Sequence, residues 1–167
     1  MLDRAATPYQ PVHNVKPYKR VEGTREIEHF FRAAAGLDVD KDDIKRYYVF
    51  IDKKIDDLLL IAQHTAKAND RFVVEPRDLP ITKGLQESIH AFEALDLDIG
   101  LRRILKEAVP EPQIDLLYSD ATEARLPAIA GGLSLAFART FTIIDPHIKH
   151  IAMEQWDRAF QIFDLLL

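Results

Sequence analysis

The stretch Asp70-Arg71-Phe72-Val73-Val74-Glu75-Pro76-Arg77-Asp78-Leu79 decides the fold of this 167-residue chain. It closes a long helical pattern and places Arg71 seven residues before Asp78, a residue type that often caps the start of a helix. On its own, this decapeptide also fits an ordinary connection between two helices, with a capping aspartate and an unrelated arginine. The rest of the chain has to decide whether the loop belongs to a more specific fold.

A long amphipathic helix is predicted directly before this stretch. From Ile44 to Ala66 the apolar residues recur at intervals of three and four, and Asp40 is a good N-cap. The predicted helix, residues 41–68, is roughly 40 Å long at 1.5 Å per residue. A short helix over residues 26–35 precedes it. Short neighbours alone cannot cover so long a helix, so we expect a second long helix across it.

The second half of the chain repeats the order of a short, a long and a short helix, although no residue-level repeat is visible. The three predicted helices cover residues 98–109, 119–144 and 153–166. Gly131 and Gly132 lie inside the long one, where each glycine costs about 1 kcal/mol relative to alanine. Close approach of another element is the usual compensation, so we expect the two long helices to cross at this pair, near Ile55.

Four short runs in the loops have the pattern of extended segments. They are residues 37–39, 72–74, 114–117 and 148–151. In a head-to-tail arrangement of the two halves, the first loop of each half would pair with the second loop of the other.

From about residue 26 to residue 166 the chain resembles two histone folds fused in one polypeptide, similar to a bacterial family of single-chain histone-fold pseudodimers. The resemblance implies an all-α fold, in which two short-long-short helix units form an intramolecular handshake pair with minor β bridges between loops. It also implies that Arg71 pairs with Asp78 as the cap of the third helix. The second half departs from the pattern, because its second loop, residues 146–152, has no arginine.

The predicted organisation has three parts. A Pro-rich arm covers residues 1–24, a first histone-fold half covers residues 25–96, and a second half covers residues 97–167. The two halves are expected to form one compact unit that folds without a partner.

Size and composition fit a cytoplasmic protein. With 47% hydrophobic residues, a chain of this length can bury a substantial core. It has no cysteine, and therefore no disulfide or thiolate site, as is usual in a reducing compartment. No apolar run approaches the roughly 18 residues of a membrane span, and the N-terminus lacks the pattern of a secretory signal. We expect no membrane contact.

Charge is unevenly distributed along the chain. The first 25 residues hold five basic and two acidic side chains, whereas the remaining 142 hold 17 basic and 25 acidic ones. An acidic body of this kind argues against a strongly electrostatic nucleic-acid binder.

The histone resemblance implies DNA contacts through the N-termini of the first helices and through basic loop residues. The candidates are Lys16, Lys19 and Arg20 in the arm, Arg25 and Arg32 on the first short helix, Arg102, Arg103 and Lys106 on its counterpart, and Arg71, Arg77 and Lys149 in the second loops. Four aspartates in the first loop would repel phosphate: Asp38, Asp40, Asp42 and Asp43. A solvated helix face explains the basic residues of the second short helix equally well. DNA binding is therefore expected to be weak at physiological salt.

Two Glu-x-x-His pairs raise the alternative of a metal-binding helical protein. Glu26 with His29 and Glu87 with His90 have the spacing found in di-iron four-helix bundles. Such bundles need four long helices and two further glutamates, whereas this sequence predicts two long helices, so a chance match is favoured. His147 and His150 in the last loop lack a third firm ligand. No metal or cofactor is assigned.

The sequence predicts no catalytic site. None of the three serines lies in a nucleophile or phosphate-binding motif, and the aromatic stripe of Trp156, Phe160 and Phe163 fits core packing. The apolar end at Leu165-Leu166-Leu167 offers a docking site for a second copy, so the protein is expected to be a monomer or a weak homodimer. The favoured interpretation is a non-enzymatic binding or scaffolding module whose target is a protein. A weak DNA-associated architectural protein is the alternative.

Overall fold

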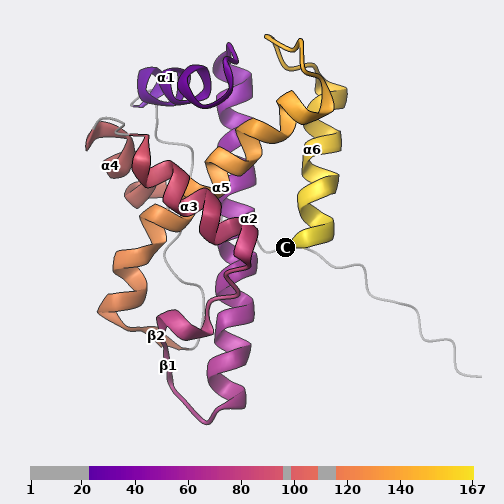
Figure 1. Ribbon diagram of the computed structural model, residues 1–167. Helices are drawn as coiled ribbons and strands as arrows, with labels where there is room; N and C mark the ends of the chain where they lie inside the picture. Colours follow the sequence, from indigo (N-terminus) through magenta and orange to yellow (C-terminus); the bar gives the residue numbers. More distant parts are fainter. Residues whose placement is uncertain (1–22, 96–98, 109–115) are drawn as a thin grey trace, which may run out of the picture.

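The computed structural model describes residues 23–95, 99–108 and 116–167 (Figure 1). The described chain is mostly helical, as predicted. Its elements are α1 (Thr24–Ala35), α2 (Lys41–Ala68), β1 (Val73–Val74), the 3-10 turn η1 (Pro76–Asp78), α3 (Lys83–Ala94), α4 (Ile99–Ala108), β2 (Leu117–Tyr118), α5 (Asp120–Ile144) and α6 (Met153–Leu166). Residues 1–22 of the predicted arm lie outside the described residues, and with them Lys16, Lys19 and Arg20.

Helix α2 begins at a reciprocal cap. The carboxylate of Asp40 accepts hydrogen bonds from the backbone N–H groups of Asp42 and Asp43, at 2.8 and 2.9 Å, and the Asp43 carboxylate accepts one from the Asp40 N–H. These bonds satisfy N–H groups that a helix start leaves unpaired. The helix has the bounds that its periodicity predicts.

Helix α5 lies at the centre of the protein, between α2, α3 and α6 (Figure 1). It is long and apolar enough to cross a membrane by length and composition, which corrects the expectation that the chain has no such segment. However, 56% of its most apolar window is buried inside the protein, which is typical of a core helix. Ser119 caps its start, accepting a hydrogen bond from the Thr122 N–H.

The close approach predicted at the glycines of α5 is made by α3. A methyl group on Gly132 would lie 2.8 Å from the backbone nitrogen of Ile89, and one on Gly131 would overlap the ring of Phe92. The helix that faces this pair is therefore α3, and not α2 at Ile55, which corrects the predicted crossing. Helical periodicity shows which face of a helix is packed but not which element packs against it.

The loops of the two halves pair crosswise, as predicted. Strand β1 lies parallel to β2, with Val73 opposite Leu117 and Val74 opposite Tyr118. Around the first loop, Asp38 forms a parallel bridge with His150. Each half therefore contributes its first loop to one pair and its second loop to the other.

An aromatic cluster joins α2 to α5 and α6. The rings of Phe50 and Phe137 stack with centroids 3.7 Å apart, and Phe163 meets both edge-on. Trp156 is fully buried and donates its indole N–H to the Asp43 carboxylate at 2.8 Å. The predicted aromatic stripe of α6 thus belongs to the core, and its tryptophan connects the second half to the start of α2.

A buried lysine fastens the end of α6 to α2. Lys54 is 1% exposed, and its ammonium donates to Asp164 at 2.7 Å and to Asp57 at 3.3 Å. Hydrogen bonds from Lys53 and Lys54 hold the pKa of Asp164 below its ordinary value. A buried cation requires such partners, because it would otherwise be desolvated without compensation.

Candidate interaction site at the paired loops

The ion pair between Arg71 and Asp78 organises the loop after α2. Arg71 donates from one guanidinium nitrogen to Asp78 Oδ2 at 2.6 Å and from the other to Oδ1. The Asp78 side chain is 1% exposed, and its Oδ2 also accepts the backbone N–H of Glu75 at 2.8 Å. The hydrogen bond from Arg71 lowers the pKa of Asp78 below its ordinary 3.8, although burial acts in the opposite direction. This carboxylate is therefore held in its charged form.

Asp78 does not cap the third helix, which corrects the role implied by the histone resemblance. It is the last residue of η1, and α3 starts only after Thr82, whose hydroxyl accepts the N–H of Leu85 at 3.2 Å. Pro80 is the physical reason, because a residue before proline avoids the helical conformation and Leu79 is extended here.

Three apolar side chains project from the loop pair that this ion pair supports. Phe72 is 82% exposed, Leu117 74% and Val73 37%. We call Phe72, Val73 and Leu117 the apolar tip. Figure 1 places the two strands at the far end of α2, away from α1.

The backbone under the apolar tip is held firmly. Val74 is fully buried, and its carbonyl accepts the Ser119 N–H at 3.0 Å and the Thr122 hydroxyl at 2.9 Å. Both donors belong to the start of α5, so the tip is fixed to the central helix. Exposed apolar side chains on a rigid support are typical of a surface that binds a partner.

The charges around the apolar tip are acidic on balance. Arg71 is neutralised by Asp78, and Arg77 pairs with Glu75 at 2.8 Å. Three exposed acidic side chains are near the tip in the sequence: Asp70 lies two residues before Phe72, Asp120 three residues after Leu117, and Glu123 in the first turn of α5. Arg77 also lines a shallow open hollow with Thr65, Asn69, Arg71 and Asp78.

Three aspartates at the opposite loop pair have partners within the protein. Asp38 pairs with Arg32 at 3.1 Å, and Asp42 pairs with Lys45 at 2.9 Å. Asp43 is buried against Trp156. Repulsion of phosphate by this loop is therefore weaker than its composition suggests.

The described basic residues predicted to contact DNA outside the apolar tip lie at two places. Near the first loop, Arg32 forms a salt bridge with Asp38, and Lys149 is exposed in the last loop, where its backbone carbonyl accepts the Asp38 N–H at 2.8 Å. Arg25, Arg102, Arg103 and Lys106 are exposed at one end of the molecule. They share that end because Gly23, just before α1, lies against Ile104 of α4.

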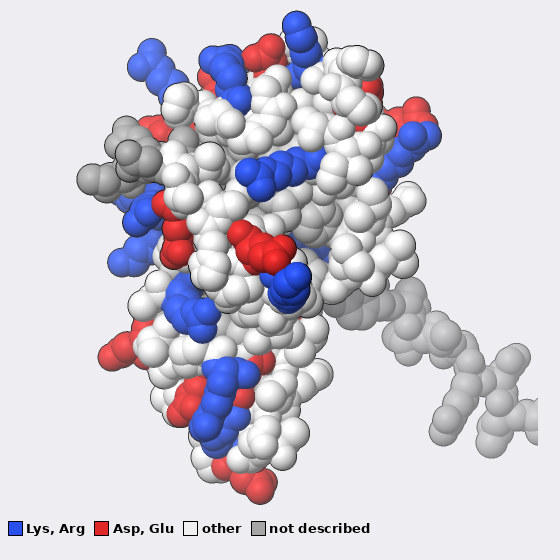
Figure 2. Space-filling view, viewed as in Figure 1, with Lys and Arg blue, Asp and Glu red and all other residues white. Residues whose placement is uncertain are grey.

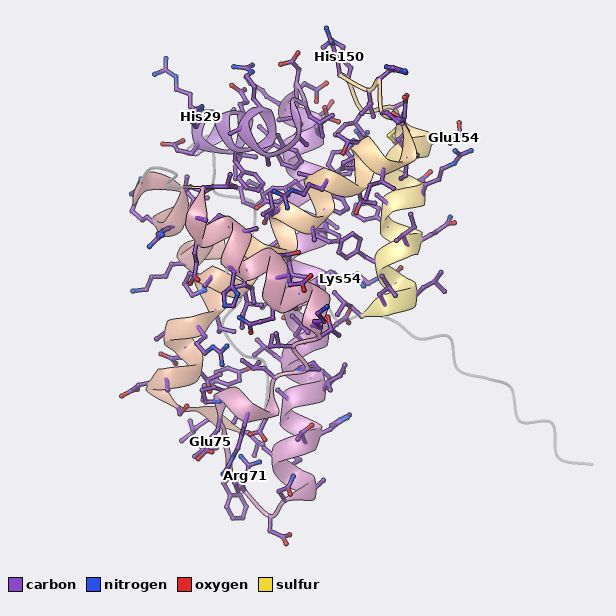
Figure 3. All side chains as sticks on the ribbon, in the orientation of Figure 1. His29, Lys54, Arg71, Glu75, His150 and Glu154 are labelled. Atoms are coloured by element: carbon purple, nitrogen blue, oxygen red, sulfur yellow. The ribbon has the colours of Figure 1, made fainter. Side chains whose placement is uncertain are left out.

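On the face drawn in Figure 2, Lys and Arg are dispersed among white and red atoms and form no continuous basic surface. Figure 3 shows that His29 and Arg71 lie at opposite ends of the molecule.

The two Glu-x-x-His pairs do not form a joint metal site, because the described residues hold no group of three or more His, Asp or Glu side chains suited to a metal. Glu87 is instead 3.3 Å from Lys83.

These features define a mostly helical protein whose two halves are joined by crosswise loop pairs around one core. The chain belongs to the family described as a domain of unknown function, DUF1931, which matches residues 27–164.

Two solved structures and one further relative are similar to this chain. A crystal structure of a protein from Thermus thermophilus is 41% identical, covers 86% of this chain and 97% of its own, and has a TM-score of 0.77. Another, from Aquifex aeolicus, is 23% identical, covers 90% and 99%, and has a TM-score of 0.78. An Aquifex aeolicus relative described as an uncharacterized protein is 23% identical over 135 residues, 81% of this chain and 79% of the relative.

Sequence reasoning identified the residues of the apolar tip as strand residues but did not foresee their exposure. In a strand, successive side chains point to opposite faces, so one of the neighbours Phe72 and Val73 would be expected in the core. Both are exposed instead, and Val74 is the buried residue. The acidic residues on either side, Asp70 and Asp120, were the available signal, because charged residues commonly flank a surface strand.

Proposed function

We propose that this protein is a single-chain histone-fold pseudodimer that acts in the cytoplasm as a non-enzymatic binding or scaffolding module. The order of two short-long-short helix units supports this proposal, as does the crosswise pairing of their loops. In such an arrangement each half supplies the interface that a separate chain would otherwise provide.

A protein target is favoured over bare DNA, and the apolar tip is the observation that carries this preference. In a DNA-binding histone the paired loops would present basic side chains to phosphate. Here one loop pair presents Phe72 and Leu117, and its two arginines are already bound to carboxylates. An exposed aromatic and an exposed leucine have little to gain from a phosphate backbone, but they can be buried against a protein.

Weak DNA binding is the second candidate function. The exposed cations Arg25, Arg102, Arg103 and Lys106 support it, because the packing of Gly23 on Ile104 brings their two helices to the same end of the protein. The acidic body makes this contact local and sensitive to salt.

The two candidates separate in a titration of labelled duplex DNA, followed by fluorescence anisotropy across a salt series. We expect no saturable binding at about 0.15 M salt, and any low-salt binding should weaken steeply as salt rises. The triple variant Arg102→Ala, Arg103→Ala, Lys106→Ala should abolish the low-salt signal, whereas Arg158→Ala on the exposed face of α6 should leave it intact. Saturable binding at physiological salt would reverse the preference for a protein target.

A further inference from the structure

We propose that the apolar tip of one copy binds residues 15–21 in the arm of a second copy. This inference rests on the proposed function, since it names the partner of a protein-binding surface. The resulting contact is head-to-tail, between the strand end of one molecule and the arm of the next.

The tip has the chemistry to hold a short segment that is both apolar and basic. Phe72 and Leu117 offer two large exposed apolar side chains on a fixed backbone. Val73, which follows Phe72, lies directly opposite Leu117 in the strand pair. The exposed carboxylates of Asp70 and Asp120 lie two residues before Phe72 and three residues after Leu117. A partner segment that placed cations beside its apolar side chains would satisfy both.

The arm contains such a segment at Val15-Lys16-Pro17-Tyr18-Lys19-Arg20-Val21. Three cations alternate there with two valines, a tyrosine and a proline, and no acidic residue interrupts them. Tyrosine is among the residues most often found at the centre of interfaces, and proline restricts the backbone of the segment that carries it. The negative charge of residues 26–167 also attracts a basic segment over longer range.

A molecule cannot place this segment on its own tip. Val15, the first residue of the segment, lies eight residues before Gly23, and Gly23 packs against Ile104 of α4. Eight extended residues reach at most about 29 Å. The tip lies at the end of α2 remote from α1 (Figure 1), and the 28 residues of α2 span about 42 Å. The occupant must therefore come from a second copy, through a heterologous interface.

Photo-crosslinking between isotopically distinct copies of the full chain tests this proposal. p-Benzoylphenylalanine replaces Leu117, so that Phe72 is kept, and equal amounts of unlabelled and 15N-labelled protein are mixed and irradiated. Mass spectrometry of the cross-linked peptides should join position 117 to residues 15–21. Mixed-isotope pairs should be as frequent as same-isotope pairs, because the partner is drawn at random from the solution.

Two variants make the test specific. Phe72→Glu should lower the cross-link yield by roughly tenfold, as expected for loss of a central anchor. Leu165→Glu is the matched control, because Leu165 is 85% exposed on α6 and its substitution should leave the yield unchanged. Triple reversal of Lys16, Lys19 and Arg20 to glutamate should lower the yield as Phe72→Glu does.

The proposal is overturned if no cross-link reaches residues 15–21, if all such cross-links are same-isotope pairs, or if Leu165→Glu lowers the yield as much as Phe72→Glu. These outcomes leave the DNA titration unaffected, so the choice of partner can fail while the proposed protein target stands.

Discussion

Gly132→Ala is expected to lower the free energy of unfolding by about 2–3 kcal/mol, even though alanine improves helix propensity by about 1 kcal/mol. The added methyl group would lie 2.8 and 2.9 Å from the backbone nitrogen and Cα of Ile89. Backbone atoms cannot move aside as a flexible side chain does, so α3 would have to shift away from α5. Urea unfolding of the two proteins measures the difference.

Gly84→Ala is the matched control for this substitution. Gly84 also lies in a helix, near the start of α3, but a methyl group there would meet no atom within 4 Å. We expect this variant to gain between a few tenths and about 1 kcal/mol, because only the unfolded chain loses freedom. If both substitutions stabilised the protein, the close packing of α3 on α5 described above would be wrong.

Removal of either partner of the Arg71–Asp78 ion pair is expected to have the second large effect. Asp78→Ala should cost about 3 kcal/mol, since it leaves the Glu75 N–H and a partly buried guanidinium without their acceptor. Arg71→Ala should cost about 2 kcal/mol, because Asp78 keeps its backbone hydrogen bond. Together the two substitutions should cost at least about 1 kcal/mol less than the sum of the single ones.

The exposed pair of Glu154 and Arg158 on α6 provides the comparison for this cycle. Its side chains are 73% and 58% exposed and lie one helical turn apart. Coupling in such surface pairs is about 0.3–0.5 kcal/mol. If the double-mutant cycle at Arg71 and Asp78 gave a coupling free energy no larger than this, the ion pair would not be what organises the loop.

Much of the secondary structure could be predicted because the sequence marks helix ends by local chemistry. Asp40 and Ser119 supply the caps of the two long helices, and both helices begin directly after them. The crosswise loop pairing was predicted from extended segments at matching places in both halves, together with an assumed head-to-tail arrangement of the halves. The caps alone are local signals, which do not depend on the elements that later pack together.

The errors concern choices that only tertiary packing makes. The glycines of α5 indicated a close neighbour, but nothing local distinguished α3 from α2. The charge of Asp43 suggested a surface residue, whereas its carboxylate is buried as the acceptor for Trp156. The exposure of Phe72 could not be predicted either, because a large aromatic side chain is usually assigned to the core.

The central claim is that both halves form one unit within a single chain. Equilibrium unfolding of the full protein, followed by Trp156 fluorescence and by far-UV circular dichroism at two widely separated dilute concentrations, tests it most directly. Trp156 reports on contact between the halves through Asp43, whereas circular dichroism reports on every helix. The account predicts coincident single transitions with the same midpoint at both concentrations. At these dilute concentrations, at which the proposed contact between copies is dissociated, a midpoint that rises with protein concentration would contradict it, as would two separate transitions.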